Sequence, residues 1–98
     1  MEISVNHGDA MVVKINGRID TVTSAQMDAR LKEEVVTESK VIMVFADVEY
    51  ISSAGLRLLL ALKNYYAEKN KEFEIHNINA VVREVFSVTG FKNMLTIK

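Results

Sequence analysis

The hydrophobic pattern of the chain predicts five strands. Residues 2–5 and 73–78 alternate polar and apolar side chains, as half-buried strands do, and in the second run this directs Glu74 and His76 outward. Residues 41–45 are all apolar and rich in β-branched side chains, which indicates a buried central strand. The predicted strands cover residues 2–5, 11–15, 41–45, 73–78 and 94–97.

Helical periodicity and capping residues predict the elements between these strands. Residues 25–36 carry an apolar stripe at four-residue spacing, which indicates a helix with one face on the sheet, and Thr23 or Ser24 would cap its start. A last helix follows an asparagine cap and ends at Gly90, since glycine suits a helix C-terminus. This order predicts one α/β domain over residues 1–98, a mixed sheet of four or five strands with about three helices mainly on one side.

The middle helix, predicted over residues 54–69, has apolar side chains on two neighbouring faces. One sheet contact covers a stripe of roughly 100°, so part of the second face needs another partner. For Leu58 and Leu62 the sequence leaves two interpretations open. A neighbouring helix or loop covers them, or they stay exposed as a surface that binds another protein.

Composition excludes several classes of function. Lys and Arg number 12 and Asp and Glu 13, so a formal charge of −1 provides no excess of positive charge for nucleic acid or an anionic membrane. The chain has no cysteine for a disulfide, a thiolate nucleophile or a metal site. It shows neither a signal-peptide pattern nor an apolar run of membrane-spanning length. We therefore expect a cytoplasmic domain without a cofactor, a metal, membrane insertion or direct nucleic-acid contact.

The candidate site lies between the central strand and the leucine-rich helix. Ser52, Ser53 and Gly55 are residue types that leave a strand and open a helix. A serine there has its hydroxyl at the positive end of a helix, beside backbone N–H groups without intrahelical partners. Such a position suits an anionic group, including a phosphate on the serine itself. The alternative is that Ser52 or Ser53 only caps the helix, and spacing alone favours that alternative.

A serine hydrolase is not supported by the sequence. Asp47 and Glu49 are the nearest carboxylates to Ser53, but nucleophilic catalysis also needs a base and an oxyanion hole. His76 is predicted on another strand, and a Gly-x-Ser-x-Gly elbow is absent. His7 lies in a turn with no carboxylate cluster near it in sequence, so we expect it to be solvated. No enzymatic activity is predicted.

Residues 47–57, Asp-Val-Glu-Tyr-Ile-Ser-Ser-Ala-Gly-Leu-Arg, resemble the signature of the STAS domain, named for sulphate transporters and anti-sigma factor antagonists. The likeness is greatest to the free-standing bacterial anti-sigma factor antagonists, and it implies the STAS fold. An ungapped match places that family's phosphorylated serine on Ser53. The chain departs from the pattern at Ser52, where many members have Asp, and at Ala54, where they have Ser or Thr. Ser52 therefore remains an alternative acceptor.

The resemblance extends to a Gly-x-x-Asp loop, matched by Gly17 and Asp20, which in the family lies beside the phosphorylated serine and contacts partners. From the helix itself, Arg57 is a candidate contact for a partner carboxylate or for the added phosphate. The partner-binding residues expected on these grounds are Gly17, Asp20, Thr21, Ser52, Ala54, Gly55, Arg57, Leu58 and Leu62.

The resemblance implies a switch between protein partners. The unphosphorylated chain would bind an anti-sigma factor that is also a serine kinase, and so release the sigma factor. Phosphorylation of Ser53 would end this binding, and a serine phosphatase would restore it. Two alternatives are a STAS subunit of a transporter complex and a module that holds a nucleotide or phosphate at residues 53–55. The sequence also leaves a weak homodimer open.

Overall fold

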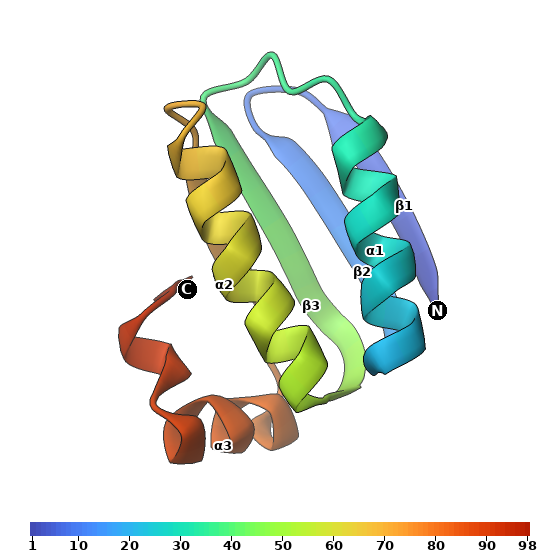
Figure 1. Ribbon diagram of the computed structural model, residues 1–98, viewed down its shortest axis with the longest axis vertical. Coiled ribbons are helices and arrows are strands. Elements are labelled where there is room, and N and C mark those ends of the chain that lie inside the picture. The colour runs from blue at the N-terminus through green and yellow to red at the C-terminus, as the bar shows by residue number, and fades with distance from the viewer.

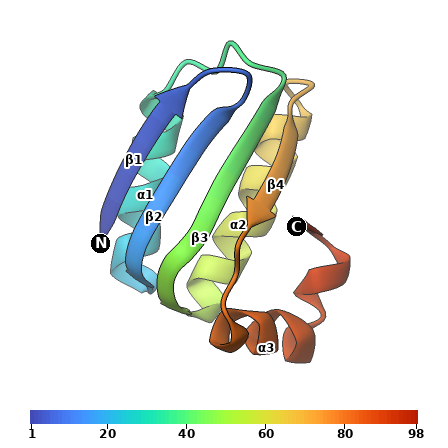
Figure 2. The same ribbon diagram turned by 180° about the vertical axis from the view of Figure 1, so that it is seen from behind.

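A five-stranded mixed sheet carries two helices on one face and leaves its other face open (Figures 1 and 2). The computed structural model describes residues 1–98. The strands lie in the order β1-β2-β3-β4-β5, with β1 antiparallel to β2 and every other neighbouring pair parallel. The strands are β1 (Glu2–His7), β2 (Met11–Ile19), β3 (Lys40–Ile51), β4 (Glu72–His76) and β5 (Thr96–Ile97).

Three α-helices connect the strands, and the first two begin at the same end of the sheet (Figure 1). Helices α1 and α2 lie side by side on one face, while α3 crosses the end of the sheet where β3 finishes (Figures 1 and 2). The expected fold class is thereby confirmed. The helices are α1 (Thr21–Glu33), α2 (Ser53–Ala67) and α3 (Ala80–Thr89), with a short 3-10 helix η1 (Phe91–Asn93) after α3.

The core is the single layer between the sheet and its helices. Alternate side chains of β2 and β3 point into it, and the helices supply the opposite wall. Burying each large apolar side chain contributes about 1.5–3 kcal/mol, so this layer is the main source of stability. The residues fully enclosed there include Met11, Val13 and Ile15 of β2, Met43 and Phe45 of β3, Met27 and Leu31 of α1, and Leu59 and Tyr66 of α2.

Strand β3, with 12 residues, is more than twice as long as the apolar run that predicts it. Its register against β2 shifts between Lys14 and Asn16 and again between Gly17 and Arg18, and each shift places one extra residue on β3. These bulges break the alternation of side chains over residues 46–50, so the sequence pattern there indicates a connecting segment instead of a strand. The structure shows that β3 runs to Ile51, immediately before the candidate site.

Of the two interpretations left open for Leu58 and Leu62, exposure is wrong for Leu62, which is also among the expected partner-binding residues. Leu62 is 1% exposed, because α2 turns it toward the sheet together with Leu56 and Leu59. Leu58 is half-buried and packs against the same core. The sheet-facing side of α2 thus buries more of the leucines than the sequence suggests. The solvent-facing side is correspondingly less apolar than the sequence suggests.

His7 enters ion pairs that the sequence does not predict. His7 lies between Glu38, at 2.8 Å from Nδ1, and Glu34, at 3.0 Å from Nε2. Both carboxylates are about thirty residues away in sequence, and they raise the pKa of His7, chiefly through the hydrogen bond with Glu34. His7 is exposed, as expected, with 41% of its side chain accessible, but it is also held by two carboxylates that the sequence does not place near it.

Glu74 is buried, where the alternation of β4 directs it outward. It does lie on the helix-free face, but a histidine and two lysines cover it there: His76 at 2.9 Å, Lys40 at 3.2 Å and Lys98 at 3.4 Å. The hydrogen bond with His76 is the main reason that the pKa of Glu74 falls to about 2. This cluster joins β3, β4 and the residues after β5.

Candidate functional site

The candidate site forms where β2 and β3 end side by side. Ile19 and Ile51 are the last paired residues of the two strands. The next backbone N–H, that of Ser52, donates a hydrogen bond to the carbonyl oxygen of Ile19 at 2.8 Å. The fold thus brings the loop around residues 17–21 and the start of α2 together, although more than thirty residues separate them in the chain.

The two serines have different environments at the start of α2. Ser52 is the N-cap, half-buried, and its hydroxyl oxygen accepts a hydrogen bond from the Gly55 N–H at 3.3 Å. Ser53 is the first residue of the helix, and its side chain is exposed. The capping role that the sequence leaves to either serine therefore belongs to Ser52, and the exposed hydroxyl belongs to Ser53.

Gly55 allows α2 to begin against the strand ends. It is buried, and a Cβ atom added there would lie 2.7 Å from Ile19 Cγ2 and 2.7 Å from Ile51 Cγ1. Real Cβ atoms essentially never approach other carbons so closely. A side chain would push the helix start away from both strands, so this glycine determines where Ser52 and Ser53 lie.

Asp20 caps α1 at the same end of the sheet, in place of the expected Thr23 or Ser24. Its carboxylate accepts a hydrogen bond from the Thr23 N–H at 2.9 Å, and the Thr23 hydroxyl oxygen accepts one from the Asp20 N–H at 2.8 Å. The hydrogen bond from the Thr23 N–H is the main cause of the lowered pKa of Asp20. Its carboxylate is therefore ionised at neutral pH and directed into its own helix.

The remaining predicted residues lie around these two helix starts. Gly17 has a φ of +110°, a backbone conformation that favours glycine. Thr21 is the exposed first residue of α1, the position that Ser53 takes in α2. Ala54 is half-buried, whereas Arg57 is exposed. Because Arg57 follows Ser53 by four residues on one helix, the two side chains are neighbours on the same face.

Three exposed side chains beside the site are not identified by sequence reasoning. The guanidinium carbon of Arg18 lies 4.8 Å from the centre of the Tyr50 ring, a cation–π contact between paired residues of β2 and β3. Tyr50 is 37% exposed, and Val22 in the first turn of α1 is 67% exposed. The pairing depends on the bulged register of β3, which no local pattern reveals.

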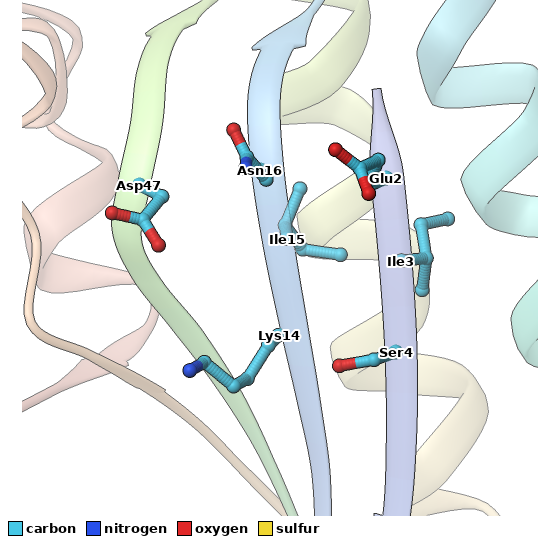
Figure 3. Close-up of a pocket in the computed structure, with 7 residues that line it drawn as sticks. All are labelled: Glu2, Ile3, Ser4, Lys14, Ile15, Asn16 and Asp47. Atoms are coloured by element: carbon cyan, nitrogen blue, oxygen red, sulfur yellow. The ribbon is translucent and has the colours of Figure 1, made fainter.

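The hollows on the surface do not coincide with the serines. One, of about 230 Å³, lies on the helix-free face across β1, β2 and β3 (Figure 3). Its polar side chains gather on that face of the sheet, and the lining residues are Glu2, Ile3, Ser4, Lys14, Ile15, Asn16 and Asp47. The other hollow lies near the C-terminal ends of α1 and α2. Neither is lined by residues 52–55, so no pocket encloses a small ligand at the helix start.

Neither a metal-binding cluster nor a membrane-spanning helix is found in the structure. No group of three or more His, Cys, Asp or Glu side chains gathers anywhere in it as a metal site would require. None of its helices combines the length and the apolar character needed to cross a lipid bilayer. The site is thus a surface of backbone N–H groups, hydroxyls and arginines around the starts of two helices.

Several known proteins are similar to this chain in sequence. The chain is 27% identical over 99% of its length, and 85% of the relative's, to BtrV of Bordetella bronchiseptica, which is named for a proposed role as an anti-sigma factor antagonist. It is 24% identical over 96% of its length, and 88% of the relative's, to the anti-sigma-B factor antagonist of Staphylococcus epidermidis.

Among solved structures, the anti-sigma factor antagonist SpoIIAA of Bacillus, in its unphosphorylated form, superposes with a TM-score of 0.81. That match has 17% identity and covers 99% of this chain and 88% of SpoIIAA. The phosphorylated form matches with a TM-score of 0.69, 15% identity and coverage of 99% and 91%. At such identities these two structures show a common fold. A family model described as the STAS domain matches residues 2–98, and the chain belongs to the STAS domain family.

Proposed function

We propose that this protein is an anti-sigma factor antagonist whose binding to an anti-sigma factor is switched off by phosphorylation of Ser53. The observation that carries the proposal is the exposed Ser53 at the first position of α2, held beside the 17–21 loop by the bond from Ser52 to Ile19. The names of the relatives, BtrV and the staphylococcal anti-sigma-B factor antagonist, supply the class of partner.

Ser53 is a better phosphate acceptor than Ser52. A kinase must reach the hydroxyl, and Ser53 is exposed while Ser52 is half-buried. The Ser52 oxygen also accepts the hydrogen bond that caps α2, so phosphorylation of Ser52 would disturb the cap. Modification of Ser53 leaves that hydrogen bond in place.

The surface around Ser53 also tolerates a phosphate. The modification adds about 1.5–2 negative charges, which the positive end of α2 favours. Arg57, one helical turn later, is an exposed guanidinium on the same face and can pair with the phosphate. We therefore expect phosphorylation to change the surface locally and to leave the sheet and the core as they are.

A local change is sufficient to turn binding off. In the unmodified state the partner would contact the Ser53 hydroxyl, the 17–21 loop, Arg57 and the exposed part of Tyr50 and Val22. A phosphate in such an interface must lose water wherever it faces an apolar group, and it repels any acidic group facing it. A ratio of 10⁴ in affinity needs only about 5.5 kcal/mol, so one phosphate can provide the switch without refolding.

The proposal is tested by incubating the protein with an anti-sigma factor kinase of its own organism and ATP, followed by intact mass. We expect one added phosphate on the wild type and on Ser52→Ala, and none on Ser53→Ala. Ser53→Ala should still bind the anti-sigma factor, which shows that the variant is folded. Modification of Ser53→Ala but not of Ser52→Ala would move the acceptor to Ser52. Binding without modification of any variant would refute the phosphorylation switch.

A further inference from the structure

The two edges of the sheet are built differently. On one side the edge strand β5 has only two residues and is preceded by η1. On the other side β1 has six residues and pairs with β2 in an unbroken register (Figure 2). Natural sheets blunt their edges with short strands, bulges, proline or lysine. β5 is blunted in this way, while β1 contains no bulge, proline or lysine.

The side chains of β1 fall into two sets. Ile3 and Val5 face the helices, are half-buried and pack against the edge of the core. Glu2, Ser4 and Asn6 point to the helix-free face and are exposed. The outer backbone edge of β1 has no neighbouring strand. Such an edge provides main-chain donors and acceptors to another extended segment.

We propose that β1 is a self-association edge, on which a second copy of this chain pairs its own β1 in the antiparallel direction. A two-fold axis perpendicular to the sheet keeps the helix-covered faces of both copies on one side. With the axis through Ser4, Ser4 faces Ser4 of the second copy and Ile3 faces Val5. The same register pairs Glu2 with Asn6, so no two like charges lie opposite each other.

The side chains favour this register over the one in which the two-fold axis passes through Val5. It pairs Ile3 with Val5 twice, once on each side of the axis, and both side chains still have surface left to bury. An axis through Val5 would instead place Ile3 opposite His7. Because His7 is held between Glu34 and Glu38, that pairing would set a charged cluster against an apolar side chain.

The pairing joins the two sheets into one of ten strands and leaves the candidate functional site accessible. Ser53 follows β3, and β3 is separated from the β1 edge by β2. The interface is a single pair of short strands, smaller than stable dimer interfaces usually are. We therefore expect a weak dimer, in equilibrium with the monomer and independent of phosphorylation of Ser53.

A cysteine cross-link tests the register. The chain has no cysteine, so Ser4→Cys introduces a unique thiol. Paired residues across an antiparallel ladder lie about 4.5–5.5 Å apart between Cα atoms, within the range of about 4.4–6.8 Å that a disulfide spans. Under mild oxidation we expect Ser4→Cys to give a covalent dimer at least tenfold faster than Thr96→Cys, an exposed position on the opposite edge. Equal rates would overturn the proposed register.

Sedimentation velocity over a concentration series tests the association itself. We expect the wild type and Thr96→Lys to dimerise, and Ser4→Lys and Ser4→Glu to stay monomeric because like charges then meet at the axis. Mixing Ser4→Lys with Ser4→Glu should restore a dimer. A monomeric wild type at every concentration up to the solubility limit would overturn the proposal, as would dimers of both Ser4 variants alone. Since Ser4 is exposed, circular dichroism should show that all variants are folded.

Discussion

Replacement of Gly55 by alanine tests how tightly α2 is fitted to the strand ends. Alanine in a helix is more favourable than glycine by about 1 kcal/mol, so helix propensity alone predicts a more stable protein. The structure predicts the opposite, because the new Cβ would lie 2.7 Å from carbons of both Ile19 and Ile51. Overpacking of this kind costs about 1–3 kcal/mol.

The side chains of Ile19 and Ile51 have little room to move away from the added Cβ atom. Ile19 is 0% and Ile51 1% exposed, so neither side chain can turn into solvent. We therefore place the cost in the upper half of its range, at about 2–3 kcal/mol, and expect a net loss of about 1–2 kcal/mol once the propensity gain is subtracted. For a domain of this size that corresponds to a decrease in Tm of roughly 5–15 °C.

Urea unfolding of the wild type, Gly55→Ala and Ala61→Gly measures both contributions. Ala61 is exposed within α2, so its replacement by glycine reports the propensity alone, with an expected loss of about 1 kcal/mol. Amide exchange of the Ser52 N–H should also be faster in Gly55→Ala, because the helix start moves away from Ile19. A Gly55→Ala protein more stable than the wild type would show that the strand ends can move apart, and would refute the tight fit.

Three further predictions concern caps and ion pairs. Ser52→Ala should lower the free energy of unfolding by about 1 kcal/mol through the lost cap, while Ser53→Ala should change it by less than about 0.5 kcal/mol, as denaturant titration can show. Because the pKa of His7 is raised above 6.5, its ion pairs stabilise the fold below that pH and are lost as pH rises through the folded-state pKa. Thermal unfolding of the wild type should therefore show a fall in Tm as the pH rises through the folded-state pKa of His7, and His7→Gln should show a smaller fall over the same pH range. Equal falls in the two proteins would contradict a stabilising role of the His7 ion pairs. Since the pKa of Glu74 lies at about 2 instead of 4.5, its contribution is fully present above pH 4.5 and is lost as pH falls through about 2. Glu74→Gln should accordingly be less stable than the wild type at pH 7, with a difference that shrinks steadily below pH 4.5, and a difference as large at pH 2 as at pH 7 would point to a cause other than charge.

The order of elements and the place of the site follow from local signals. Alternation, the apolar run at residues 41–45 and the leucine-rich stretch identify the sheet and its helices. The two serines and Gly55 mark the start of α2 within one residue, since Ser52 is the cap and Ser53 the first helical residue. These features depend on neighbours in the chain, and that is why the sequence reveals them.

Features that depend on distant residues are not visible in the sequence. The bulges of β3 exist only relative to β2, and they decide that Tyr50 lies beside Arg18. The burial of Glu74 requires Lys40 and Lys98 from other elements. Leu62 is buried because the face of α2 that carries it packs against the sheet, and with apolar residues on two faces the sequence does not decide which face does so. In each case the missing information is the tertiary partner.

The most direct test of the proposed switch is the affinity of one anti-sigma factor for the unmodified protein and for the protein phosphorylated on Ser53. Isothermal titration calorimetry of both forms, with amide NMR spectra of each, measures binding and structure together. We predict a loss of affinity of about 10²-fold or more, equivalent to about 2.7 kcal/mol, with spectral changes confined to the starts of α1 and α2 and their neighbours. Equal affinities, or changes spread across the whole sheet, would contradict the account.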